Sequence, residues 1–276
     1  MSGAAGAAGE AASDDATVDG AAADGSVTDA AAAEQAALAA LLADPGPSGS
    51  AWAYGDEPDQ VAELFGPADG PLVVVVHGGY FRPGTDRIHA RPQARALAEA
   101  GFRVVLAEYR RTPGSPELSV KDLGLLDAAL PRPAAAWVGH SAGGALVLLR
   151  ALAADLAPVP VLALAPVADL AVAYRDRLGS DAVRDWIGGS PTERPDAYAR
   201  LDPQALLTSG VEPGAPVAVV HGEADVAVPV ALSRGLPPSP AITVQLLPGR
   251  HHLDLIDPAS PAWPTVLKTL RALTGR

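Results

Sequence analysis

Ser141 lies where the chain changes from a predicted strand to a predicted helix. The apolar run 135–138 precedes the sequence G-H-S-A-G-G, and a helix-like run, 143–154, follows it. A strand that turns at once into a helix strains the residue at its apex, and small neighbours let the backbone close up. The turn exposes the serine hydroxyl and aims a helix N-terminus at it, which favours negative charge there. We interpret Ser141 as a nucleophile, the alternative being a structural strand–helix turn.

A serine hydroxyl is a poor nucleophile and needs a base. Four of the six histidines are explained by local turns and element ends: His77, His89, His140 and His221. The other two, His251 and His252, lie in a loop between the last predicted strand and the final helix. Adjacent residues in a loop point in different directions, so only one of them faces Ser141. This argument alone does not choose between the two.

The base needs a carboxylate to orient it. Asp225 follows the predicted strand 217–220, at the carboxyl end of that strand. The order of serine, then this aspartate, then the histidine pair is a known order of triad members along a chain. Glu223, two residues earlier, and Asp169, after the preceding strand, are the alternatives.

Two glycines after another predicted strand can supply hydrogen-bond donors. Gly78 and Gly79 follow the run 72–76, and glycines let backbone N–H groups converge on a small volume. One or both of these amides, with the amide of Ala142 directly after the serine, would stabilise an oxyanion. A plain glycine turn at the end of a strand is the alternative.

The elements that must position these residues alternate along the chain. Predicted strands cover 72–76, 102–107, 135–138, 159–165, 217–220 and 242–247, and helix-like segments cover 91–100, 120–130, 143–154, 230–235 and 263–274. The alternation predicts an α/β fold with a mostly parallel central sheet and helices on both faces. The active site of such a sheet lies beyond the carboxyl ends of its strands. The stretch 174–214 exceeds one crossover and predicts a small helical cap, the alternative being an ordinary crossover with a surface helix.

The first fifty residues differ from the rest. They hold eight acidic side chains and no Lys or Arg. Apart from Met1, residues 1–28 have no large apolar side chain beyond valine, which predicts disorder. Residues 29–43 could form an alanine-rich helix, which the Pro/Gly stretch 45–49 ends. The sequence therefore predicts a low-complexity tail over 1–50 and one globular domain over 51–276.

Composition excludes several classes of function. The 276 residues include no cysteine, which rules out disulfides, thiolate metal sites and a cysteine nucleophile. A net charge of −12 argues against a nucleic-acid partner. No secretory signal is recognisable, and the apolar runs are too short to cross a bilayer, so we expect a cytoplasmic location and no membrane partner. The alanine-rich, cysteine-free composition fits a GC-rich bacterial source.

Together these stretches resemble the α/β-hydrolase superfamily, and more closely its H-G-G-x esterases of the kynurenine-formamidase-like bacterial type. The motifs H-G-G-Y-F-R, G-H-S-A-G-G, H-G-E-A-D-V-A-V-P and P-G-R-H-H-L-D-L carry the resemblance, which covers about residues 71–264. In that family an acid precedes the catalytic histidine and a bulky residue follows it. Here His251 takes the place of the acid and Leu253 is the bulky residue, so the resemblance selects His252 as the base. It also implies no cofactor and no metal.

The resemblance implies a serine hydrolase that cleaves small carboxylic esters or aryl formamides through an acyl-enzyme intermediate, as a monomer or homodimer. Tyr80, Phe81 and Trp186 are candidates for an aromatic substrate pocket, with core packing as the alternative. A prolyl-oligopeptidase-like peptidase is a second reading, although that type brings a large extra domain for which these residues leave no room. A non-catalytic binding protein of the same fold is a third, although such proteins usually lose a triad member.

Overall fold

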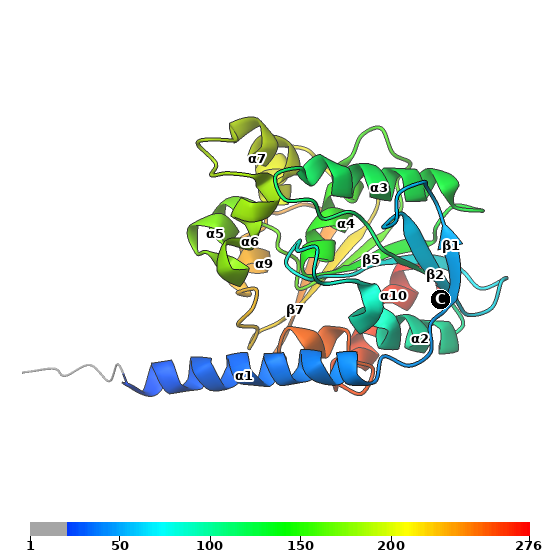
Figure 1. The fold of residues 1–276 in the computed structure, drawn as a ribbon, viewed down its shortest axis with the longest axis horizontal. Coiled ribbons are helices and arrows are strands. Elements are labelled where there is room, and N and C mark those ends of the chain that lie inside the picture. Colours follow the sequence, from blue (N-terminus) through cyan, green and yellow to red (C-terminus); the bar gives the residue numbers. More distant parts are fainter. Residues whose placement is uncertain (1–20) are drawn as a thin grey trace, which may run out of the picture.

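The computed structural model describes residues 21–276, which surround one eight-stranded sheet of order β1-β2-β4-β3-β5-β6-β7-β8 (Figure 1). The strands are β1 (Ser50–Ala53), β2 (Val61–Phe65), β3 (Leu72–Val76), β4 (Arg103–Ala107), β5 (Ala136–His140), β6 (Val161–Leu164), β7 (Val217–Gly222) and β8 (Ile242–Leu247). From β4 to β8 all neighbours are parallel, whereas β1 and β2 pair antiparallel at one edge. The predicted mostly parallel α/β sheet is confirmed.

Helices cover both faces of the sheet. The helical segments are α1 (Ala21–Ala43), η1 (Arg87–Ala90), α2 (Arg91–Glu99), α3 (Pro116–Ala129), α4 (Ala142–Leu152), α5 (Leu170–Arg175), α6 (Leu178–Ile187), α7 (Pro195–Leu201), α8 (Pro203–Thr208), α9 (Ala231–Arg234), η2 (Leu253–Leu255) and α10 (Trp263–Leu273). Helices α3 and α4 lie on one side and α2 and α10 on the other (Figure 1). None of the helices from residue 21 onward has the length and apolar character that crossing a membrane requires.

Strand β3 shows why the sheet is buried on both sides. All five of its residues are buried. Val74 and Val76 belong to the core shared with α3 and α4, whereas Val73 and Val75 belong to the core shared with α2 and α10. Alternate side chains of a strand point to opposite faces, so a run of apolar residues serves two cores at once.

Helices α5 to α8 lie between β6 and β7 and occupy most of the stretch for which the sequence predicted a cap, although the first of them already begins at Leu170. The entry to α6 is a left-handed turn, with positive φ at Arg177, Gly179, Ser180 and Asp181. The guanidinium of Arg82 donates hydrogen bonds to the carbonyls of Gly179 and Ser180, at 3.0 and 2.7 Å. A strained turn of this kind persists only where surrounding contacts hold it.

Helix α1 departs from the sequence prediction. It begins at Ala21, whereas the sequence placed the start of a helix at Asp29 and predicted disorder before it. The added turns, 21–28, contain three alanines, the best helix former, followed by five residues of lower helix propensity, so propensity alone does not explain the extension. The remainder of the predicted disorder, residues 1–20, lies outside the described residues. Near its end α1 buries Leu41 in the core of α2 and α10, and it contacts η1 and η2.

A buried carboxylate joins the antiparallel edge of the sheet to the segment before α2. Glu63 on β2 is 1% exposed and accepts hydrogen bonds from Arg91 at 2.7 and 2.9 Å. Its oxygens also accept the amide of Gly49 at 3.0 Å and lie 2.9 Å from Nε of Arg87. Burial by itself raises the pKa of Glu63, but the bonds from Arg91 and Gly49 lower it below its ordinary value.

We expect Glu63→Gln to lower the free energy of unfolding by about 3 kcal/mol, because Arg91 loses its counter-charge and Arg87 keeps only that of Glu108. A carboxylate with a lowered native pKa adds stability above its unfolded pKa, and that stability is lost as the pH falls through the native pKa. The difference between the two proteins should therefore shrink as the medium is acidified. Urea unfolding at several pH values measures it. Glu99→Gln, an exposed change at the end of α2, is the control; equal losses in the two variants would contradict the prediction.

Candidate active site

Ser141 occupies a strained turn between β5 and α4. Its φ is 56° and its ψ is −117°, a conformation that side-chain-bearing residues rarely adopt. Two glycines allow the close packing around it. A Cβ on Gly139 would lie 2.3 Å from the carbonyl oxygen of Gly143, and a Cβ on Gly143 would lie 2.2 Å from that of Val76. The turn therefore rests directly on the end of β3.

The loop after β3 lies against this turn. A Cβ on Gly78 would be 3.0 Å from Cβ of Ser141, and Gly79 has a φ of +115°. Within residues 21–276, the amides of Gly79 and Ala142 donate no hydrogen bond to a backbone carbonyl. The structure thus brings the three predicted donor residues, Gly78, Gly79 and Ala142, close to Ser141.

His77, Glu108 and Arg111 form a buried cluster, the Glu108 cluster, which holds that loop in place. Nδ1 of His77 donates to the carbonyl of Gly78 at 2.6 Å, and Nε2 lies 3.1 Å from Glu108. Arg111 pairs with Glu108 and donates to the carbonyl of Arg82 at 3.0 Å. Burial alone raises the pKa of Glu108, but His77 and Arg111 lower it well below its ordinary value. The sequence alone assigned no role to this cluster. Glu108 and Arg111 are the two ends of an E-Y-R-R stretch, residues 108–111.

Asp225 and His252 form a hydrogen-bonded pair. Nδ1 of His252 donates to Oδ2 of Asp225 at 2.7 Å, and the amide of Val228 donates to Oδ1 at 2.8 Å. His221, which is fully buried, places Nε2 3.2 Å from the same Oδ2. Burial raises the pKa of Asp225, but the His252 charge and these bonds outweigh it and lower the pKa well below the usual range. Burial lowers the pKa of His252, but Asp225 outweighs it and raises that pKa.

The alternative base and acids lie elsewhere. Nδ1 of His251 bonds to the carbonyl of Ala224 at 2.9 Å, on the other side of the loop. Glu223 forms an ion pair with Arg234 at the surface. The carboxylate of Asp169 accepts from Val172 at the start of α5. None of the three candidates borders the cavity described next.

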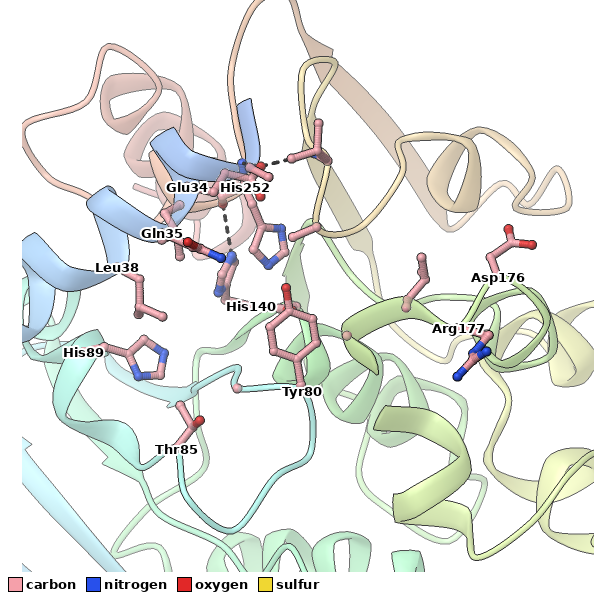
Figure 2. Close-up of a pocket in the computed structure, with 18 residues that line it drawn as sticks. Glu34, Gln35, Leu38, Tyr80, Thr85, His89, His140, Asp176, Arg177 and His252 are labelled. Atoms are coloured by element: carbon pink, nitrogen blue, oxygen red, sulfur yellow. Dashed lines mark hydrogen bonds between the residues drawn. The ribbon is translucent and has the colours of Figure 1, made fainter. Parts of the chain in front are cut away.

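A cavity of ≈ 440 Å³ contains Ser141 and His252 in its wall. Its other lining residues are Ala31, Glu34, Gln35, Leu38, Gly79, Tyr80, Thr85, His89, His140, Asp176, Arg177, Leu178, Gly179, Val226, Ala227 and Leu253. Figure 2 shows α1 on one side of this space and the segment with Asp176 and Arg177 on the opposite side. The cavity thus lies beyond the carboxyl ends of β3, β5 and β7, where the sequence predicted the site.

Only one of the three predicted pocket aromatics lines this cavity. Tyr80 points from its loop towards His252 (Figure 2), and a Cβ on Gly179 would lie 2.1 Å from its ring. Phe81 and Trp186 are instead buried and stack on each other, with ring centroids 4.0 Å apart and planes at 12°. Neither residue lines the cavity of Ser141, and both border a separate hollow beside Arg82 and Asp185. The alternative of packing holds for both.

Two further histidines border the cavity, which sequence reasoning had explained by local structure. His89 bonds through Nδ1 to the carbonyl of Asp86 at 2.8 Å, and burial, followed by the nearby His77, lowers its pKa to about 4. His140 donates from Nε2 to the carbonyl of His252 at 3.1 Å, and burial lowers its pKa well below the ordinary value. Both rings are therefore neutral at pH 7. In the sequence, His89 lies at the start of a predicted helix and His140 within the serine turn, and neither position signals a place in the cavity wall.

Helix α1 forms one wall of the cavity. Ala31, Gln35 and Leu38, spaced by three and four residues, share one helical face and line the space. The sequence had assigned this segment to a tail. Within residues 21–276, no group of three His, Asp or Glu side chains is arranged to hold a metal ion.

The chain matches no protein-family model, and its sequence matches no curated protein. Solved structures do resemble it. Esterase B from Lactobacillus rhamnosis, inhibited by a tributyrin phosphonate, is 21% identical, with a TM-score of 0.67 over 94% of this chain and 97% of that one. An acetyl ester-xyloside bifunctional hydrolase from Caldicellulosiruptor lactoaceticus is 18% identical, with a TM-score of 0.62 over 83% and 97%.

A monoacylglycerol lipase from Paleococcus ferrophilus is 20% identical, with a TM-score of 0.54 over 78% of this chain and 98% of that one. Identities this low establish a shared architecture and leave activity to be argued from the site. TM-scores of 0.54 to 0.67 over most of each chain show that the fold is shared. The chain has the α/β-hydrolase fold.

Proposed function

We propose that this protein is a serine ester hydrolase in which Ser141 is the nucleophile, His252 the base and Asp225 the residue that orients the base. The observation that carries the proposal is the convergence of a strained serine turn and a histidine–aspartate pair on one cavity. The three solved structures described above are all named as ester-cleaving enzymes, which supports the proposal without deciding it.

The proposed reaction begins with attack of Oγ of Ser141 on the carbonyl carbon of a bound ester. Because Nδ1 of His252 donates to Asp225, its Nε2 is the atom that accepts the serine proton. The same proton then passes to the departing alcohol, which leaves an acyl group on Ser141. Water, deprotonated by His252, releases the acid and restores the serine. This transfer requires a hydrogen bond from Oγ of Ser141 to Nε2 of His252, and we expect that bond to form when substrate binds.

The negative oxygen that develops during attack needs donors in place beforehand. The amides of Gly79 and Ala142, and that of Gly78, lie around Ser141 in a backbone that the Glu108 cluster fixes. Donors held rigidly at such a position are worth more than donors in water, because they do not reorient during the reaction. Loss of one typically costs ~3 kcal/mol in the barrier.

The cavity favours a small, partly apolar substrate. Aliphatic and small side chains supply much of its wall, among them Ala31, Leu38, Leu178, Val226, Ala227 and Leu253. A volume of ≈ 440 Å³ lies near the lower end of the range for small-molecule sites. We propose a short-chain carboxylic ester as the substrate, with an aryl formamide as second candidate because the ring of Tyr80 faces the cavity. A monomer or homodimer in the cytoplasm stays a prediction.

Ser141→Ala should abolish ester hydrolysis and labelling by a fluorophosphonate, with kcat reduced about a million-fold, because a nucleophile is lost. Hydrolysis of p-nitrophenyl butyrate and mass-spectrometric mapping of the labelled peptide measure the two effects. Ser209→Ala, an exposed serine at the end of α8, is the matched control. Ester hydrolysis or labelling that persists in Ser141→Ala would contradict the proposal.

Asp225→Asn should lower kcat by about 10⁴-fold, because the amide no longer holds the tautomer of His252 or stabilises its charged form. In the native protein the base must be neutral, and its raised pKa places the acid limb of the rate profile above the ordinary histidine pKa of 6.5. Activity should therefore fall as the pH drops through that limb. A profile of kcat/KM from pH 5 to 9 tests this, and a native limb at or below 6.5 would contradict it.

The substrate class can be decided by comparing esters of increasing length. We expect kcat/KM to be highest for p-nitrophenyl acetate or butyrate and at least tenfold lower for the palmitate, because a cavity of ≈ 440 Å³ limits the length of the acyl chain. N-formylkynurenine tests the aryl formamide in parallel. A kcat/KM for the formamide above that of every ester would replace the short ester by the second candidate.

A further inference from the structure

Helix α1 places a carboxylate against the two loops that hold Asp225 and His252. Glu34 is 8% exposed, and its Oε1 accepts a hydrogen bond from the amide of His252 at 3.2 Å. The same oxygen accepts the amide of Val226 at 3.1 Å. Val226 directly follows Asp225, so one oxygen atom bridges both halves of the acid–base pair. Figure 2 shows Glu34 on α1 beside His252.

These bonds join parts of the chain that are far apart in sequence. Glu34 lies 192 residues before Val226 and 218 before His252. Helix α1 is also held in place independently of Glu34, because Leu41 is buried and Leu38 packs against the core of α2 and α10. Removal of the Glu34 carboxylate should therefore leave α1 in place, and its effect can be read at the site.

We propose that Glu34 is a positioning residue of the active site, which fixes the backbone of His252 relative to Asp225 and makes α1 part of the catalytic unit. The proposal rests on the hydrolase function proposed above. Two other contacts join the same loops away from Glu34. The amide of Ala224 donates to the carbonyl of Arg250 at 3.0 Å, and Nδ1 of His251 bonds to the carbonyl of Ala224 at 2.9 Å. Glu34 thus adds a link at the base itself.

The charge of Glu34 gives it an effect that a merely structural link would lack. Nearby negative charge stabilises the imidazolium that His252 becomes during attack, and Glu34 adds to Asp225 in raising the pKa of His252. Two other titratable groups around this ring are uncharged at pH 7. The ring of His140 is neutral and lies tilted by 44° with its centroid 4.4 Å from that of His252, and burial, with Glu34 and Asp225 nearby, raises the pKa of the Tyr80 hydroxyl.

His221, His89, His251 and Asp254 are further ionisable groups near the pair, and Asp254 accepts the amide of His251 at 2.7 Å. His221 reaches His252 only through Asp225, and His89, neutral with its pKa of about 4, lies next to the cavity on η1. Arg177, on the opposite side of the cavity, is paired with Asp181. Against the lowering effect of burial, Asp225 and Glu34 are the two charges that raise the pKa of His252.

The test uses the full chain with Glu34→Gln, which keeps the shape and an acceptor oxygen but removes the charge, and Glu34→Ala, which removes both. Asp44→Asn is the matched control, because it removes a negative charge from an exposed position just after α1. We expect Glu34→Gln to move the acid limb of kcat/KM to lower pH. Glu34→Ala should also lower kcat roughly tenfold, with a smaller change in KM, because the base loses its anchor.

An NMR titration of the His252 ring, in protein labelled at histidine, measures the same pKa without any turnover. It separates the two proposals, because a protein that hydrolyses no ester can still report whether Glu34 acts on His252. A lower His252 pKa in both Glu34 variants, and an unchanged one in Asp44→Asn, is the expected result. Unchanged pKa and kcat in Glu34→Gln and Glu34→Ala would overturn the proposal. Thermal melting establishes that each variant is folded.

Discussion

The site depends on one close approach between backbones. The first turn of α4 lies so near the end of β3 that a Cβ on Gly143 would lie 2.2 Å from the carbonyl oxygen of Val76 and 2.5 Å from that of His77. No side chain fits in such a space. Because of this contact, the strained turn of Ser141 and the loop of Gly78 share one small volume. A nucleophile and oxyanion donors need that proximity.

Proximity alone would not keep the loop in one conformation, and buried charge supplies the rigidity. The Glu108 cluster ties the loop to the end of β4 through His77 and Arg111. Glu108 also accepts the amide of Arg87, whose guanidinium in turn pairs with Glu63 on β2. Removal of one partner from such a network leaves an uncompensated buried charge. The ion pairs at the antiparallel edge of the sheet and those beside the site therefore depend on one another.

Much of the site could be predicted from the sequence, because the signals were local. Gly139 and Gly143 flank Ser141 within one turn, and strand periodicity placed the loop of Asp225 at the correct edge of the sheet. The orientation of consecutive loop residues carried no such signal. The structure points Tyr80 into the cavity, and it stacks Phe81 on Trp186. Sequence periodicity does not report side-chain direction where two successive residues have positive φ.

The sequence allowed a helix over 29–43 but could not predict its role at the site. The partners of Glu34 lie about two hundred residues away, and the alanines of α1 carry no pattern that marks a buried face. Alanine nevertheless suits a helix that must pass close to a reactive centre, because it contributes helix propensity while it leaves room for substrate. Only the few longer side chains then decide what the helix does. Leu41 seats it, Leu38 and Gln35 line the cavity, and Glu34 reaches the amide of His252. An acidic, low-complexity segment can thus complete the wall and the electrostatics of a site whose other residues belong to the sheet.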